Sequence, residues 1–123
     1  MLSNKQILIT NNPLVNDHYS STEHVEFLDT DLSGVLTHVR NYIHKGHRLL
    51  THPMSGSIKP NESPYKSILI SDEYSITDME SVNLIEEAIL ATGKFPEKDI
   101  PEKNLKDMQI VDLSIILECL NNK

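Results

Sequence analysis

The residues best suited to chemistry lie in one segment, 51–66, which reads THPMSGSIKPNESPYK. Small residues and hydroxyls there precede a lysine, so the backbone N–H groups could wrap an anion while the lysine adds positive charge. The prolines restrict φ and lower the entropy cost of ordering the segment. Long connections without regular structure are uncommon in compact domains and are often functional. The segment therefore predicts a ligand or partner site, with solvated polar tips on a stiff connection as the alternative. The candidate residues are Thr51, His52, Ser55, Gly56, Ser57, Lys59, Asn61 and Tyr65.

A second interpretation makes the same segment catalytic. His52, beside Ser55 and Ser57, could act as a general base, and Lys59 could hold a phosphorylated or carboxylated metabolite. The chain contains no G-x-S-x-G motif and offers no obvious third member of a catalytic triad. A loop histidine with ordinary hydrogen bonds is the simpler interpretation, so catalytic residues stay unassigned.

Metal, redox and nucleotide chemistry have little support in the sequence. His44, His47 and His52 could supply imidazole ligands to zinc. However, His47 and His52 lie at opposite ends of an expected strand, about 16 Å apart at the usual strand rise. Cys119 is the single cysteine, and neither G-x-G-x-x-G nor a P-loop motif occurs. We therefore expect no metal site and no cofactor.

Four short strands and three helices are expected to position these residues. Helical spacing of apolar residues predicts the first helix, with Gly46 at its left-handed cap, and Thr77 with Glu80 suggests a capping box for the second. A strand over 110–117 competes with the last helix, but the length of the apolar pattern favours the helix. The expected strands cover 7–10, 25–28, 49–50 and 67–70, and the expected helices cover 31–46, 77–93 and 107–121.

Alternating strands and helices predict a single α/β domain over residues 1–123. We expect a small three-layer, Rossmann-like sandwich with about four mostly parallel strands and about three helices. Ligands of such sheets bind beyond the carboxyl ends of the strands. Asn11 and Asn12 follow the first strand, while Thr51 and His52 follow the third, so they are expected to share one crevice. Alternatively, the asparagines only form a turn before a proline.

Charge and hydropathy exclude several classes of protein. The formal charge is −7, but residues 38–70 hold five basic residues and one acidic residue, for a local charge of +4. This distribution argues against a general nucleic-acid binder, which needs many phosphate contacts. No apolar run approaches the roughly 18 to 20 residues that cross a bilayer, and the start lacks a signal pattern. We therefore expect a cytoplasmic protein that does not bind membranes.

The expected last helix, 107–121, carries two apolar stripes. One includes Val111 and Ile115, and the other includes Leu113 and Leu117. Two stripes predict burial on both sides or a surface for a partner, including a second copy of the chain. A homodimer through this helix is therefore one expectation, and a domain that serves only oligomerisation is a further functional hypothesis.

Two stretches of the sequence resemble the GrdX family. They are ITNNPLV at 9–15 and HKGHRLLTHPMSGSIKPNESPYKSILIS at 44–71, and acidic helices follow them as in that family. The resemblance implies a small protein encoded beside the glycine, sarcosine and betaine reductase genes of anaerobic amino-acid fermenters. It implies no catalytic residues, because the family has no established activity.

Together, these features favour an accessory or regulatory protein over an enzyme. Its expected partner is a subunit of the reductase complex or a small anionic metabolite, bound through segment 51–66. The alternative remains a small enzyme with His52 and Lys59 at its site. The sequence does not identify the ligand or decide between the two.

Overall fold

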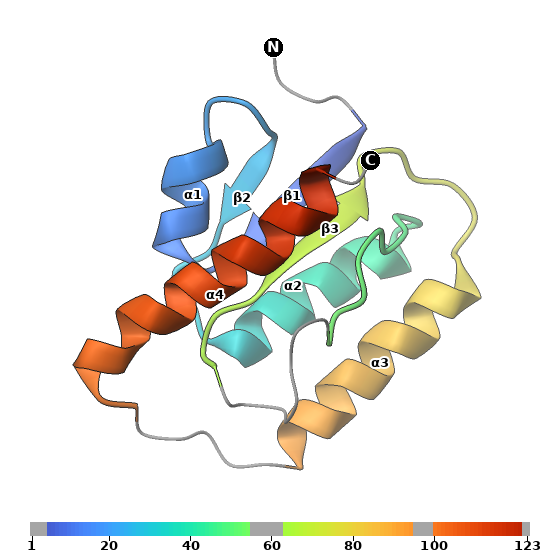
Figure 1. The fold of residues 1–123 in the computed structure, drawn as a ribbon. Helices are drawn as coiled ribbons and strands as arrows, with labels where there is room; N and C mark the ends of the chain where they lie inside the picture. Colours follow the sequence, from blue (N-terminus) through green and yellow to red (C-terminus); the bar gives the residue numbers. More distant parts are fainter. Residues whose placement is uncertain (1–4, 55–62, 95–99, 122–123) are drawn as a thin grey trace.

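The computed structural model describes residues 5–54, 63–94 and 100–121, and these form three strands and four helices (Figure 1). The sheet has the order β2-β1-β3, with β1 in the centre. The helices pack on its two faces. The elements in chain order are β1 (Gln6–Thr10), α1 (Pro13–Tyr19), β2 (Val25–Phe27), α2 (Leu32–His44), β3 (Ser67–Ser71), α3 (Met79–Gly93) and α4 (Glu102–Asn121).

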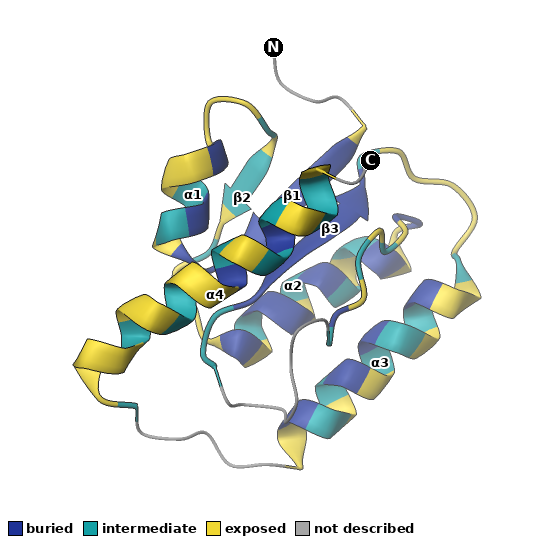
Figure 2. Ribbon diagram, viewed as in Figure 1, coloured by how far each residue is buried: buried dark blue, intermediate teal, exposed yellow. Residues whose placement is uncertain are grey.

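The alternation of side chains along β1 divides the core between two helix layers. Ile7 and Ile9 belong to a buried cluster with α2 and α3, whereas Leu8 belongs to a second cluster with α1 and α4. Successive strand residues point to opposite faces, so this central strand is apolar throughout its middle. Figure 2 shows the buried strands β1 and β3 between helices whose outer faces are exposed.

The expectation of about four mostly parallel strands in a Rossmann-like sandwich with about three helices is wrong. The described part of the chain has a three-stranded mixed sheet and four helices. β2 runs parallel to β1, but β3 runs antiparallel to it. Leu49 forms only an isolated antiparallel bridge to Ile70. Parallel neighbours need a crossover, usually a helix, and none is described between residue 49 and β3.

Helical spacing predicted three of the helices correctly. The expected helices over 31–46, 77–93 and 107–121 correspond to α2, α3 and α4, so residues 110–117 are helical. The N-cap of α3 is Asp78, whose carboxylate accepts a hydrogen bond from Ser81 N, rather than Thr77. The sequence pattern did not predict α1, because its seven residues are too few to show helical periodicity.

Gly46 is confirmed as the left-handed residue after α2. Its φ is +110°, and a Cβ placed there would lie 2.1 Å from Ser75 O. Only glycine adopts this backbone conformation without strain and also leaves room for the loop before α3.

We expect Gly46→Ala to lower the free energy of unfolding by about 2 kcal/mol, because it combines an unfavourable φ with a backbone clash. Urea denaturation measures the loss. Gly93→Ala is the matched control, since a Cβ at Gly93 meets no atom within 4 Å. Equal effects of the two substitutions would contradict the proposed constraint at Gly46.

A cluster of titratable side chains joins the edge strand β2 to α2. Tyr42 Oη donates a hydrogen bond to Glu26 Oε2, and His38 Nε2 lies 2.9 Å from Glu26 Oε1. Partial burial raises the pKa of Glu26, but the bonds from Tyr42 and His38 outweigh this and hold it below its usual value. Burial and the bond to Glu26 raise the pKa of Tyr42 to about 12.

This cluster predicts a pH dependence of stability. A carboxylate whose pKa is lowered by folding stabilises the protein above its unfolded pKa, and this contribution disappears as the pH falls through the lowered value. The stability difference between wild type and Glu26→Gln should therefore be largest near neutral pH and shrink towards about pH 3. Urea midpoints across this range measure it.

Glu87→Gln provides the control for this experiment, because Glu87 is exposed on α3. The difference in stability between Glu87→Gln and wild type should stay small at every pH. If the Glu26→Gln and wild-type curves remain parallel down to pH 3, the cluster does not stabilise the carboxylate.

Candidate functional site

The candidate site lies at the edge of the sheet where β1 and β2 end and β3 begins. Thr10 pairs with Phe27 on one side and with Ser67 on the other, which places these three strand ends together. Thr51 lies alongside β3, where its Oγ1 accepts a hydrogen bond of 3.1 Å from Leu69 N. Because residues 48–51 run antiparallel to β3, the chain after Thr51 leads towards this same edge.

Asn11 uses its buried amide to hold two connections against the end of β1. Its Nδ2 donates to Thr30 O at 2.9 Å and to Pro64 O at 2.8 Å. Its Oδ1 accepts from Lys66 N at 2.9 Å. Both amide hydrogens and the carbonyl are therefore engaged within the protein, and the side chain fixes where segment 51–66 returns to the sheet.

Asn12, fully buried, joins two helices to the same strand end. Its Oδ1 accepts from Leu14 N at 3.0 Å and caps α1. Its Nδ2 donates to Gln109 O at 2.9 Å and to Asp112 Oδ2 at 3.0 Å, both in α4. The turn before Pro13 is thus also a helix cap and an anchor for the last helix.

We use the name Asp112 cluster for five buried residues around that carboxylate: Thr10, Asn12, Lys66, Ser67 and Asp112. Ser67 Oγ donates to Asp112 Oδ2 at 2.7 Å. Since that bond uses the hydroxyl hydrogen of Ser67, the 2.7 Å contact between Thr10 Oγ1 and Ser67 Oγ has Thr10 as donor. Thr10 Oγ1 in turn accepts from Asn12 N at 3.0 Å.

Lys66 brings a positive charge to this cluster. Burial lowers the pKa of the Lys66 ammonium, and the charge of Asp112 offsets part of that effect. The net pKa is below the usual value. The carboxylate of Asp112 therefore offsets part of the cost of burying the Lys66 charge.

Tyr65 and His52 are both engaged by hydrogen bonds. Tyr65 Oη accepts from Gln109 Nε2 at 2.9 Å, which links the segment to α4. His52 is exposed, and its Nδ1 accepts from Met54 N at 3.0 Å. In the neutral ring this bond places the hydrogen on Nε2, so the outer nitrogen of His52 is a donor and not a proton acceptor.

The structure brings together part of the predicted site. Asn11, Asn12 and Tyr65 all contact segment 64–66 or α4, whereas Thr51 and His52 lie on the other side of β3. The candidates outside the described residues are Ser55, Gly56, Ser57, Lys59 and Asn61. Within the described ranges, no three His, Cys, Asp or Glu side chains are grouped to hold a metal ion.

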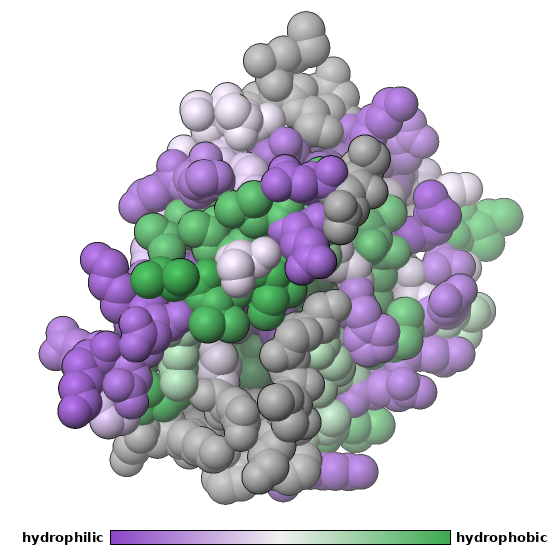
Figure 3. Space-filling model, in the orientation of Figure 1, coloured by the Kyte–Doolittle hydropathy of each residue, from purple (hydrophilic) through white to green (hydrophobic). Residues whose placement is uncertain are grey.

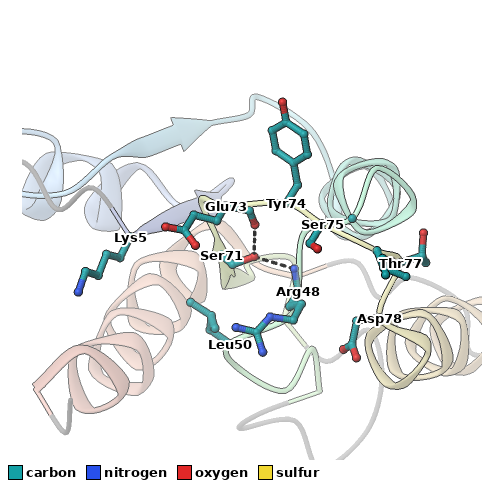
Figure 4. A pocket seen from close by; sticks show the side chains of 11 residues that line it. Lys5, Arg48, Leu50, Ser71, Glu73, Tyr74, Ser75, Thr77 and Asp78 are labelled. Atoms are coloured by element: carbon teal, nitrogen blue, oxygen red, sulfur yellow. Dashed lines mark hydrogen bonds between the residues drawn. The ribbon is translucent and has the colours of Figure 1, made fainter.

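A pocket of about 760 Å³ lies at the opposite edge of the sheet, where β1 begins and β3 ends (Figure 4). Sequence reasoning did not predict it, because its residues come from separate short connections. Side chains of both charges line it, so it does not select a simple anion. The charged lining residues are Lys5, Arg48, Glu73 and Asp78, and the lining also includes the exposed Tyr74 and Ile76.

Comparison with known proteins decides the family. A family model described as GrdX-like protein matches residues 7–121. The chain belongs to the GrdX-like protein family. This confirms the resemblance seen in the two sequence stretches, and the matched range includes both the Asp112 cluster and segment 51–66. Searches of curated proteins and of solved structures found no match.

None of the described helices in this GrdX-like protein is long and apolar enough to span a membrane. The longest, α4, has 20 residues and includes charged side chains on its outer face. Its inner face instead meets β3 and α1 through Asp112 and Ile116.

We expect Asp112→Ala to lower the free energy of unfolding of this GrdX-like protein by about 3 kcal/mol, because it leaves the buried Asn12 amide and Ser67 hydroxyl without their acceptor and removes a charge that favours the buried Lys66 ammonium. Thermal and urea denaturation measure the loss. Asp17→Ala, at an exposed position of α1, should change stability by less than about 0.5 kcal/mol. A similar effect of both substitutions would show that the Asp112 cluster does not stabilise the fold.

Proposed function

We propose that this GrdX-like protein is a non-enzymatic accessory protein of the glycine, sarcosine and betaine reductase system. It binds a reductase subunit or a small anionic ligand through segment 51–66. The observation that carries the proposal is the anchoring of both ends of this segment on the sheet.

The anchoring consists of hydrogen bonds from side chains to the backbone. Thr51 Oγ1 accepts from Leu69 N, and Asn11 holds Pro64 O and Lys66 N. Residues between these anchors include Lys59, several hydroxyls and an asparagine. Fixed ends lower the entropy lost when such a segment binds, which favours its use as a recognition element.

The hydrogen bonds around the strand ends favour binding over catalysis. A general base needs a free lone pair within reach of the substrate. His52 uses its Nδ1 lone pair on Met54 N, and Asp112 accepts from Asn12 and Ser67. In this geometry both groups maintain the structure. In the enzyme alternative, His52 would have to give up its hydrogen bond with Met54 N before it could accept a proton at Nδ1.

The family supports the connection to the reductases. The resemblance to the GrdX family implies a gene beside those of the reductases, and such reductases use selenocysteine and cysteine chemistry. Cys119 is the single cysteine of this chain and packs against the core cluster of α1 and α4. A thiol in that position is suited to packing, which supports an accessory role and not that of a redox subunit.

Copurification tests the proposed role of the segment. We expect tagged wild-type protein to retain a reductase subunit. The pair His52→Ala with Lys59→Ala should weaken the association about tenfold, because it removes two hydrogen-bond donors from segment 51–66. His24→Ala with Lys106→Ala removes the same residue types at exposed positions elsewhere and should bind as wild type. Equal retention by both pairs would exclude segment 51–66 as the binding surface.

Calorimetry with phosphate, acetyl phosphate, glycine and betaine separates a partner protein from a small ligand. Binding of one of these at millimolar concentration, lost in the His52→Ala, Lys59→Ala pair, would assign the ligand. Conversion of any of them to product would contradict the non-enzymatic role.

A further inference from the structure

The outer face of α4 exposes an apolar pair at its centre. Ile110 is 50% exposed and Val111 is 56% exposed. Leu113 and Leu117, which the sequence pattern also suggested for a partner surface, pack instead against the core cluster with Ile116. In Figure 3 apolar side chains gather over the part of the surface formed by α4.

The residues along this outer face form a regular stripe. Exposed positions recur at spacings of four, four, three and four residues, which is the spacing of a single helix face. The stripe consists of Lys103, Asp107, Val111, Ser114 and Glu118, with Ile110 beside Val111. The opposite side of the helix holds the buried Asp112 and Ile116.

Two of the three charges on the stripe, those of Lys103 and Glu118, lie symmetrically about its apolar centre, whereas Asp107 has Ser114 at the matching position on the other side. Lys103 and Glu118 each lie seven and a half residues from the point between Ile110 and Val111, or about 11 Å at 1.5 Å per residue. One end of the stripe is therefore basic and the other acidic, at equal distances from the centre.

We propose that α4 forms a homodimer with α4 of a second copy, packed antiparallel about a two-fold axis between Ile110 and Val111. This axis places Ile110 of one chain opposite Val111 of the other. It also places Lys103 opposite Glu118 twice, once on each side of the axis. Such self-complementarity is what a two-fold interface requires, since the same patch must match itself.

The side chains on the stripe suit this packing. Ser114 is small, so two helices can approach closely near the centre. Lys103 and its symmetry copy lie about 22 Å apart along the axis, so the two basic groups are well separated. The contact uses a face that the fold leaves exposed, so Asp112 and Ile116 keep their places in the core.

Charge reversal tests the register of the dimer. In sedimentation equilibrium of the full chain, Lys103→Glu and Glu118→Lys should each weaken self-association about tenfold, because each creates two like-charge contacts. The double variant restores both pairs with reversed polarity, so its dimer dissociation constant should lie within about twofold of the wild-type value. Both positions are exposed, and circular dichroism checks that the variants fold.

A wild-type protein that stays monomeric up to about 0.5 mM would overturn the proposal. The proposed register would be overturned if neither charge reversal weakened self-association. It would also be overturned if the double variant associated no more strongly than the single variants. Disulfide trapping gives a second measurement: in a Cys119→Ser background, Val111→Cys should cross-link on oxidation, whereas Glu102→Cys, far from the axis, should not.

Discussion

Two buried amides at the end of the central strand must find hydrogen-bond partners, and the other elements are arranged to supply them. Asn11 and Asn12 follow β1 directly and are almost completely removed from water. An unpaired buried amide would cost a large part of the stability of a small domain. Asn11 is satisfied by the connections before α2 and before β3, and Asn12 by the first turn of α1 and by α4. The attachment of Pro64 and Lys66 to the end of β1 therefore depends on Asn11, one of these two buried amides.

Local sequence signals predicted the elements that have a local cause. The helical spacing of Val35, Val39 and Ile43 indicated α2, and the apolar runs indicated β1 and β3, because these patterns depend on neighbours in the sequence. Strand direction has no such local cause. Leu49 forms only an isolated bridge to Ile70, and this bridge is antiparallel. The absence of a helical pattern between 51 and 66 was the signal for that reversal.

For Asn11 and Asn12, the sequence pattern predicted the place in the fold but not the hydrogen-bond partners. The sequence pattern correctly placed Asn11 and Asn12 at the carboxyl edge of the sheet, but their amides bind other parts of the chain. Asp112, a hundred residues from Asn12, could not be connected with it from sequence, since α4 meets this edge only in the folded protein. Its position within the helix did carry a signal: a carboxylate on the same face as Ile116 lies on the buried side and needs partners. The pocket beside Arg48 had no comparable signal.

Segment 51–66 is held to the sheet at Thr51 and at residues 64–66, and the chain belongs to the GrdX-like protein family. Asn11 is central to this arrangement, because its side chain holds Pro64 O and Lys66 N at the end of β1. Hydrogen exchange of the Lys66 amide in wild type and Asn11→Ala tests it most directly, with the Leu8 amide, bonded at 2.8 Å to His24 O, as the internal reference. The account predicts a Lys66 amide that is protected in wild type and that exchanges at least about tenfold faster in the variant, relative to Leu8. A Lys66 amide that exchanges freely in wild type, or whose rate relative to Leu8 is unchanged by the substitution, would contradict it.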